Sequence, residues 1–177
     1  MKYTLLLILF SLLSCQNKVV QEQTINENID FFDEALESNS QEPILSIYCK
    51  FTECGEWGGH QEHLTISKKD SNSFKLKYEK YSVDCDSMVK IFDGSSYTIQ
   101  PKNTLVKTDE IQINNTEKQA ILDFSFSMVK SKFKEQFSGH SGLVVSIINS
   151  DSTFFIRTYG GEADHYLILK NKLGLKE

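Results

Sequence analysis

Proline and glycine are scarce in this sequence, which has only 2 prolines and 9 glycines among its 177 residues. This scarcity excludes a collagen-like chain and a proline-rich, low-complexity chain. The longest apolar stretch, residues 5–14, is too short to cross a bilayer, because a membrane-spanning helix needs about 20 residues. The composition is 40 % hydrophobic and 24 % charged, which is typical of a globular protein, and the length suits one domain.

Arginine is nearly absent, since Arg157 is the one arginine among 19 basic residues. Arginine is the side chain best suited to bidentate contacts with phosphate and guanine. The charge is also unevenly placed: residues 16–43 contain seven acids and the single base Lys18, whereas residues 44–177 contain 17 acids and 17 bases. A neutral domain whose bases are almost all lysine is a poor nucleic-acid binder, so we expect no nucleic-acid partner.

The N-terminus has the layout of a secretory signal peptide, in which Lys2 precedes about ten apolar residues. The apolar stretch ends in Leu12-Leu13-Ser14-Cys15, which resembles the lipobox of bacterial lipoproteins: an aliphatic residue, a permissive position, a small residue and cysteine. The resemblance implies cleavage before Cys15, thioether lipidation of its sulfur and acylation of the new amino group, which together anchor a protein to a membrane. The alternative is an ordinary signal peptide in which Cys15 occurs by chance.

The residue after the cysteine refines the expected location. It is Gln16, whereas aspartate at this position argues for inner-membrane retention in the enterobacterial pattern. The resemblance therefore implies a bacterial cell-envelope protein anchored to the outer membrane and facing either the periplasm or the surface. We divide the chain into a signal peptide (1–14), an acidic tether with a short helix at Asp30–Ser38 (15–43), and a globular domain (44–177).

Alternating apolar and polar residues predict an antiparallel sheet in the domain. Three strands are expected to form a meander, at residues 44–52, 60–68 and 74–85. In this register Leu64 lies opposite about Tyr78, and a slip of the apolar phase near Lys80 predicts a bulge. Two further hairpins are predicted, at 89–99 with Asp93-Gly94 as its turn, and at 143–159.

One long helix is predicted to start at Asn114, where Glu117 completes a capping box, and to stop at Gly139. The segment from Asp164 to Leu173 is expected to form a capped helix, with a last strand as the alternative. The long helix has two apolar stripes, namely Leu122, Phe126, Val129, Phe133 and Phe137, and Ile121, Phe124 and Met128. The expected fold class is α+β: a single domain with a twisted antiparallel sheet of six to eight strands and one long helix packed on a face.

Three cysteines remain after lipidation, and export to an oxidising compartment favours one disulfide among them. The meander register brings Cys54 and Cys85 to the same end of the sheet, so we predict a Cys54–Cys85 disulfide. Cys49 lies in mid-strand and is expected to be a buried free thiol. The alternative pairing is Cys49–Cys85, which the bulge near Lys80 would permit.

The densest cluster of unusual residues runs from Cys54 to His63. His60 and His63 are three apart on a strand, which places them on opposite faces, so we predict no metal site. In the structural interpretation the glycines form a turn and Trp57 covers one end of the core. In the alternative interpretation the loop is a partner-contact surface, consisting of Glu56, Trp57, His60, Glu62 and His63.

The stretch Gly58-Gly59-His60-Gln61-Glu62, with the amphipathic hairpin after it, resembles small uncharacterised lipoproteins of Bacteroidota. No activity comes with this resemblance, so it adds nothing to the prediction of function. We predict a non-catalytic, lipid-anchored envelope protein without a cofactor, whose domain binds a protein partner or a small ligand. A structural or inhibitor module that docks on another envelope protein through the 53–63 loop is a third class.

The alternative function is an envelope hydrolase or metal-dependent enzyme that uses His60, His63 or His165. The pairing of a carboxylate, Glu162 or Asp164, with His165 would suit acid–base chemistry, although Asp164 also fits a helix N-cap. Convergence of the three histidines and Glu162 in a pocket would favour the enzyme. An exposed Trp57 on a flat or convex surface would favour the interaction protein.

Overall fold

The computed structural model describes residues 43–70, 73–92, 94–134, 142–159 and 163–175. The signal peptide, Cys15 and nearly all of the tether, including the helix predicted at Asp30–Ser38, lie outside this part. The elements in chain order are β1 (Pro43–Lys50), the 3₁₀ turn η1 (Gly55–Trp57), β2 (Gln61–Asp70), β3 (Ser73–Phe92), β4 (Tyr97–Ile113), α3 (Asn115–Lys134), β5 (Val144–Asn149), β6 (Phe155–Tyr159) and α4 (Ala163–Lys172).

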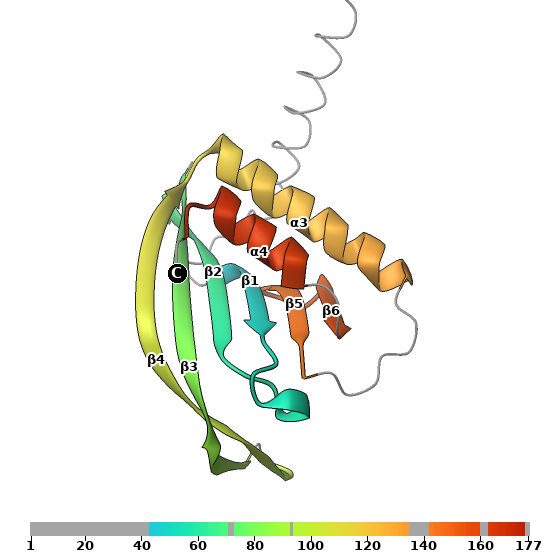
Figure 1. The fold of residues 1–177 in the computed structure, drawn as a ribbon. Helices are drawn as coiled ribbons and strands as arrows, with labels where there is room; N and C mark the ends of the chain where they lie inside the picture. The colour runs from blue at the N-terminus through green and yellow to red at the C-terminus, as the bar shows by residue number, and fades with distance from the viewer. Residues whose placement is uncertain (1–42, 71–72, 93, 135–141, 160–162, 176–177) are drawn as a thin grey trace, which may run out of the picture. The chain divides into compact units, whose positions relative to one another are not determined.

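The strands form one antiparallel sheet in the order β4-β3-β2-β1-β5-β6, and α3 and α4 lie side by side on one face of it (Figure 1). The predicted fold class is therefore confirmed. The predicted meander is confirmed as well, because β1, β2 and β3 are neighbours and Leu64 pairs with Tyr78. The 143–159 hairpin is present as β5 and β6.

The core lies between the sheet and the two helices. Side chains alternate along each strand, so one face of every strand points toward the helices. Residues at the centre of this layer are fully buried, among them Ile47, Leu64, Leu76, Ile121, Met128, Ile147 and Leu169. The layer thereby removes the apolar face of the sheet from water, which is the main stabilising term of such a fold.

Helix α3 begins with the predicted capping box. The Asn114 side-chain oxygen accepts a hydrogen bond from the Thr116 amide at 2.8 Å, and Glu117 accepts one from the Asn114 amide at 2.9 Å. The described helix ends at Lys134, and the predicted stop at Gly139 lies outside the described residues.

The helix buries all of one predicted stripe and only part of the other. Ile121, Phe124 and Met128 are buried, and so is Leu122 of the second stripe, whereas Phe126 and Phe133 are 56 % and 88 % exposed. The prediction of the second stripe is therefore wrong at Phe126 and Phe133, and Phe137 lies outside the described residues. At 3.6 residues per turn Phe126 lies about 140° around the helix from Ile121, and a sheet on one side covers only one of these positions.

The strand predicted at 74–85 and the hairpin predicted at 89–99 belong to one long hairpin. β3 pairs with β4 from Phe74↔Ile113 to Phe92↔Tyr97, with register shifts between Lys80 and Tyr81 and between Asp84 and Met88. The predicted bulge near Lys80 is confirmed. The predicted strand ends Phe92 and Tyr97 pair with each other, so Asp93-Gly94 is part of a connection of four residues.

Candidate functional site

The loop between β1 and β2 is a turn closed by its own backbone. The Cys54 amide donates to the Gly58 carbonyl at 2.7 Å, and the Gly58 amide donates to the Gly55 carbonyl at 3.0 Å. Gly55 and Gly58 have φ angles of 64° and 88°, which residues with a Cβ rarely adopt. These glycines therefore serve the turn, as the structural interpretation predicts.

Trp57 is 53 % exposed, so the prediction that it covers one end of the core is wrong. No residue of η1 is buried. The turn is held by backbone hydrogen bonds and by the disulfide at Cys54, so it does not depend on apolar packing. Glu56 next to it is also exposed. An exposed tryptophan is informative, since large aromatic side chains are enriched at the centres of protein interfaces.

Glu62 of β2 is only 1 % exposed and lies under α4. It accepts a hydrogen bond from the Tyr166 hydroxyl at 2.9 Å, and Lys170 Nζ lies 2.9 Å from Oε1 and 2.8 Å from Oε2. His60 Nε2 lies 3.5 Å from Oε1. The proposal that Glu62 belongs to a contact surface is thus wrong, because its side chain is buried among these partners.

His60 connects this carboxylate to the loop. Its Nδ1 pairs with Glu53 Oε1, and its amide donates to Glu53 Oε2 at 3.1 Å. Its ring stacks on Phe51 at 4.0 Å between centroids and an interplanar angle of 9°. We define the Glu62 network as Glu53, His60, Glu62, Tyr166 and Lys170.

The groups around Glu62 favour the ionised form of its carboxyl group. Burial acts to raise the pKa of Glu62, but hydrogen bonds from His60, Lys170 and Tyr166 outweigh it and lower that pKa to about 2. Burial acts to lower the pKa of His60, but hydrogen bonds to Glu62 and Glu53 outweigh it and raise that pKa. The network thus joins two carboxylates to Lys170 and to His60, and Lys80 Nζ lies 3.9 Å from Glu62 Oε1 as a more distant cation.

This arrangement suits a structural role better than a role in proton transfer. A general base needs a pKa near the working pH and an oxygen free to face a substrate, whereas both oxygens of Glu62 are engaged and its pKa is far below neutral. Among the described residues, no group of three or more histidine, cysteine or acidic side chains is placed to hold a metal ion. The network joins the loop, β2 and α4.

The other two predicted histidines lie elsewhere. His63 is on the opposite face of the sheet from Glu62, with its ring 4.9 Å from that of Tyr48 and 5.1 Å from that of Tyr81. Burial lowers its pKa. His165 is on α4, and α4 begins at Ala163, so Asp164 lies in the first turn and is not the N-cap.

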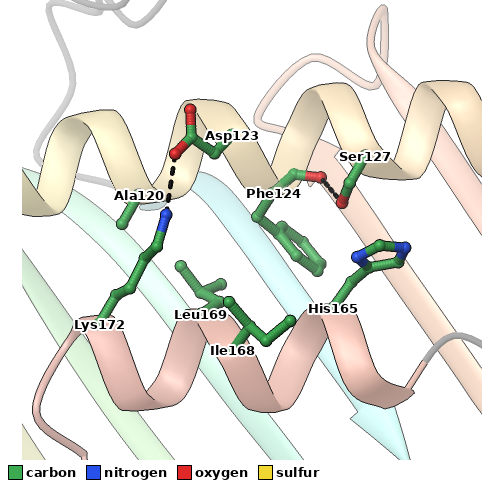
Figure 2. Close-up of a pocket in the computed structure, with 8 residues that line it drawn as sticks. All are labelled: Ala120, Asp123, Phe124, Ser127, His165, Ile168, Leu169 and Lys172. Carbon is green, nitrogen blue, oxygen red and sulfur yellow. Dashed lines mark hydrogen bonds and ion pairs between the residues drawn. The ribbon is translucent and has the colours of Figure 1, made fainter.

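His165 lines a small pocket between α3 and α4 (Figure 2). The pocket measures about 120 Å³, which is less than the roughly 300–1,000 Å³ of typical ligand sites. Asp123 and Lys172 pair across it at 2.9 Å, and the Ser127 hydroxyl donates to the Phe124 carbonyl at 2.6 Å. His60, His63 and His165 therefore have three separate surroundings, and Glu162 lies outside the described residues.

The structure contains the predicted Cys54–Cys85 disulfide, with Cα atoms 5.4 Å apart. Cys85 lies in a bulge, because the partner in β4 moves by only one residue while β3 advances from Asp84 to Met88. The bulge takes Cys85 out of the regular ladder and toward the loop. Cys49 is buried and free, as predicted, and burial raises its pKa.

Beyond the Gln61↔Tyr81 pair, β3 and β4 continue without a third strand of the described sheet beside them (Figure 1). We define the arm as Ser82–Phe92 of β3 and Tyr97–Thr104 of β4. Its large apolar side chains are between 41 % and 61 % exposed, namely Met88, Ile91, Phe92, Tyr97 and Ile99. The disulfide joins the root of the arm to the loop that carries Trp57, so these exposed aromatic and aliphatic residues lie at one end of the domain, while others are exposed on α3, α4, β6 and the rest of β4.

Sequence reasoning missed Tyr166 and Lys170 as partners of Glu62. A signal was present, because Lys170 follows Tyr166 by four residues and shares a helix face with Leu169 and Leu173. Lysine on an otherwise apolar helix face indicates a buried acidic partner, since lysine is almost never fully buried unpaired. The arm was missed because its strands were divided between the strand predicted at 74–85 and the hairpin predicted at 89–99.

The chain was compared with known proteins in three ways. No family model matches it, no curated protein is significantly similar to it in sequence, and no solved structure is significantly similar to its fold. None of the helices in the described part is long and apolar enough to cross a membrane.

Proposed function

We propose that this chain is a lipid-anchored, non-catalytic protein of the bacterial cell envelope whose domain binds a protein partner. The observation that carries the proposal is the exposed end of the domain, where the arm and Trp57 present uncovered apolar side chains. Soluble domains rarely expose contiguous apolar patches without a use for them.

The arm supports a binding role because of its construction. A two-stranded hairpin is only marginally stable in water, and apolar residues at its tip add no folding energy unless something covers them. The disulfide nonetheless fixes its root to the loop. β1 begins with Pro43 opposite Ser67, at the end of the sheet away from the loop.

The separation of the three histidines removes the geometric support for the alternative, an envelope hydrolase or metal-dependent enzyme. His60 is held by two carboxylates, His63 lies among tyrosines on the other face, and His165 lines a pocket of about 120 Å³. No described observation favours a second function.

Anchoring through Cys15 rests on the Leu12–Cys15 pattern and is tested separately. Cys15→Ala should release the protein from the membrane fraction and abolish labelling by a palmitate analogue. Ser14→Ala is the matched control, because alanine keeps a small residue before the cysteine and should preserve both. Continued labelling of Cys15→Ala would overturn the anchor.

Partner binding is tested by photo-crosslinking in intact cells. A photoreactive residue is placed at Trp57 or Phe92, and in the control at Phe126, which is equally exposed but lies on α3. We expect discrete crosslinked products from positions 57 and 92 and none from 126. Absence of products at both test positions would overturn the proposed function.

A further inference from the structure

The Cys54–Cys85 disulfide joins two parts of the domain that lie outside its core. No residue of η1 is buried, and the hydrogen bonds of the loop described above run within the loop or to His60. On the other side of the disulfide, the arm continues without a third strand of the described sheet beside it. Neither part therefore depends on the apolar layer between the sheet and the helices.

Cys85 lies where the ladder of the arm is interrupted. Asp84 and Met88 on either side of it pair with Lys102 and Pro101, which are adjacent in β4, so Cys85 and the two residues after it have no partner there. A bulge disrupts the ladder locally, and a two-stranded ribbon is only marginally stable by itself. The disulfide thus fixes the hairpin at a point where its own ladder does not.

The disulfide is open to a reagent from solution. Cys85 is exposed and Cys54 is half-buried, whereas Cys49 is 0 % exposed and pairs with Glu62 on the face toward the helices. Thiol–disulfide exchange requires a thiolate to reach a sulfur atom, so Cys85 can be attacked and Cys49 takes no part. The exchange is therefore confined to one pair of cysteines.

From these observations we propose that the Cys54–Cys85 disulfide is a redox-sensitive latch, which a protein dithiol opens to free the loop and the root of the arm while the core stays folded. A thiolate of the dithiol attacks Cys85 Sγ, the S–S bond breaks, and Cys54 leaves as a thiolate and takes up a proton. The second thiol then attacks the mixed disulfide and releases Cys85 as a thiol, so two electrons and two protons pass to the chain and the dithiol becomes a disulfide. This inference rests on the proposed function, because the latch controls how Trp57 and the arm are presented together.

The charges around Cys85 favour a dithiol over a single thiol as the reductant. Asp84 and Asp86 are exposed on either side of Cys85 and repel an approaching thiolate, while Lys102 opposite Asp84 offsets part of their charge. A single thiol must overcome this repulsion twice, once in each exchange. The second step of a dithiol takes place within the mixed disulfide, where its effective concentration is high.

The core does not depend on the latch. Glu53 and His60 hold the two ends of the loop together, and Leu64, Leu76 and Met128 stay buried between the sheet and the helices. Opening the latch should therefore increase the motion of the loop and the arm without unfolding the domain, since weakly packed segments open locally.

Thiol labelling tests the latch on the full chain carrying Cys15→Ala, in which Cys49, Cys54 and Cys85 are the remaining cysteines. We expect no thiol of the native, oxidised protein to react with a maleimide. After a short treatment with dithiothreitol and removal of the reagent, Cys54 and Cys85 should react, and Cys49 should react only in denaturant. The circular dichroism spectrum should not change. A disulfide that resists dithiothreitol in the native protein, or whose reduction unfolds the domain, would overturn the inference.

Hydrogen exchange shows which segments the latch controls. On reduction, peptides from residues 51–59, 82–92 and 97–104 should exchange at least about tenfold faster, and peptides from β1 and α3 should not change. The fluorescence anisotropy of Trp57, the one tryptophan of the chain, should fall in parallel. Cys49→Ala is the matched control and should respond to dithiothreitol as the parent does. Equal exchange of the loop and the arm in the oxidised and reduced protein would refute the latch.

Crosslinking in intact cells separates failure of the latch from failure of the proposed function. Products from positions 57 and 92, normalised to the amount of folded protein, are compared between the parent and Cys54→Ala with Cys85→Ala, in which the latch is always open. We expect products in the parent and at least about fivefold less in the variant, because two separately moving surfaces bind less tightly than one preorganised surface. Equal products in both overturn the control of binding by the latch. No product from the parent overturns the proposed function, and labelling and exchange then decide the latch by themselves.

Discussion

Two regions of the same hairpin differ in what lies against them. Near the start of β3, Phe74, Leu76 and Tyr78 are at most 4 % exposed, because β2 lies beside them and the helices cover their face. Further along the same strand, Met88 and Phe92 are 43 % and 56 % exposed. Apolar side chains occur in both regions. The regions differ in what packs on them, because β2 and the two helices lie against the first region and not against the second.

The two regions also show different ways of fixing a loop. On the covered side, the Glu62 network joins the β1–β2 loop to α4 through buried ion pairs, which are effective only while every charge has its partner. At the root of the arm, the Cys54–Cys85 disulfide also fixes the loop, and a covalent bond does not need to be buried to do so. The loop is therefore held from both sides, which keeps Trp57 in a defined position although it makes no core contacts.

The largest effect is expected from breaking the Glu62 network on its covered side. Lys170→Met leaves the Glu62 carboxylate buried without its closest cation, which costs about 3–5 kcal/mol of unfolding free energy. Lys172→Met is the matched control: Lys172 also pairs with an acid, Asp123, but both side chains are 48 % exposed, so about 0–1 kcal/mol is expected. Urea denaturation measures both. Equal costs for the two variants would contradict a structural role of the network.

The disulfide should contribute nearly as much. It closes a loop with a sequence separation of 31, for which chain entropy predicts about 3–4 kcal/mol. The double variant Cys54→Ser with Cys85→Ser should lose this amount, and the parent protein should lose the same on reduction. Unchanged stability of the double variant would show that the arm and the loop are held by other contacts.

Much of the fold followed from the sequence because alternation and capping are local signals. The Leu64↔Tyr78 register, the α3 capping box and the Cys54–Cys85 pairing each depend on residues whose spacing is readable. The wrong predictions about exposure concern which element packs on a side chain. Phe126, Phe133 and Trp57 are apolar residues in favourable patterns, yet their exposure depends on which element packs on them, and that is a tertiary property.

The same distinction explains what was missed at the candidate site. Glu62 and His60 were singled out from their unusual cluster, but Tyr166 and Lys170 are more than a hundred residues away in sequence. Only the docking of α4 on β2 brings them together. The arm was visible as apolar strand residues, but its lack of a third strand became clear only from the sheet order.

The Glu62 network should also give the covered side a characteristic acid sensitivity. The pKa of Glu62 lies near its ordinary value of 4.5 in the unfolded chain and falls to about 2 in the folded protein, since the hydrogen bonds from His60, Lys170 and Tyr166 outweigh the effect of burial. Its contribution is therefore fully present above pH 4.5 and is lost as the pH falls from 4.5 toward 2. Unfolding free energy measured over this range should decline. The decline should be shallower in Glu62→Gln, and an identical slope would assign the effect to other carboxylates.

The sharpest comparison of the two regions comes from truncating one apolar residue in each, and one of these variants, Met88→Ala, has the smallest expected effect. Leu76→Ala removes a fully buried side chain and leaves a cavity between the sheet and the helices, so the unfolding free energy should fall by about 2–5 kcal/mol. Met88→Ala shortens an exposed side chain in the same strand and should change that free energy by no more than about 0.5 kcal/mol. Both are measured by urea denaturation of the purified protein, so that no other protein covers the arm. A cost for Met88→Ala close to that of Leu76→Ala under those conditions would mean that the arm is covered within a single chain, and the argument for a partner on its face would fail.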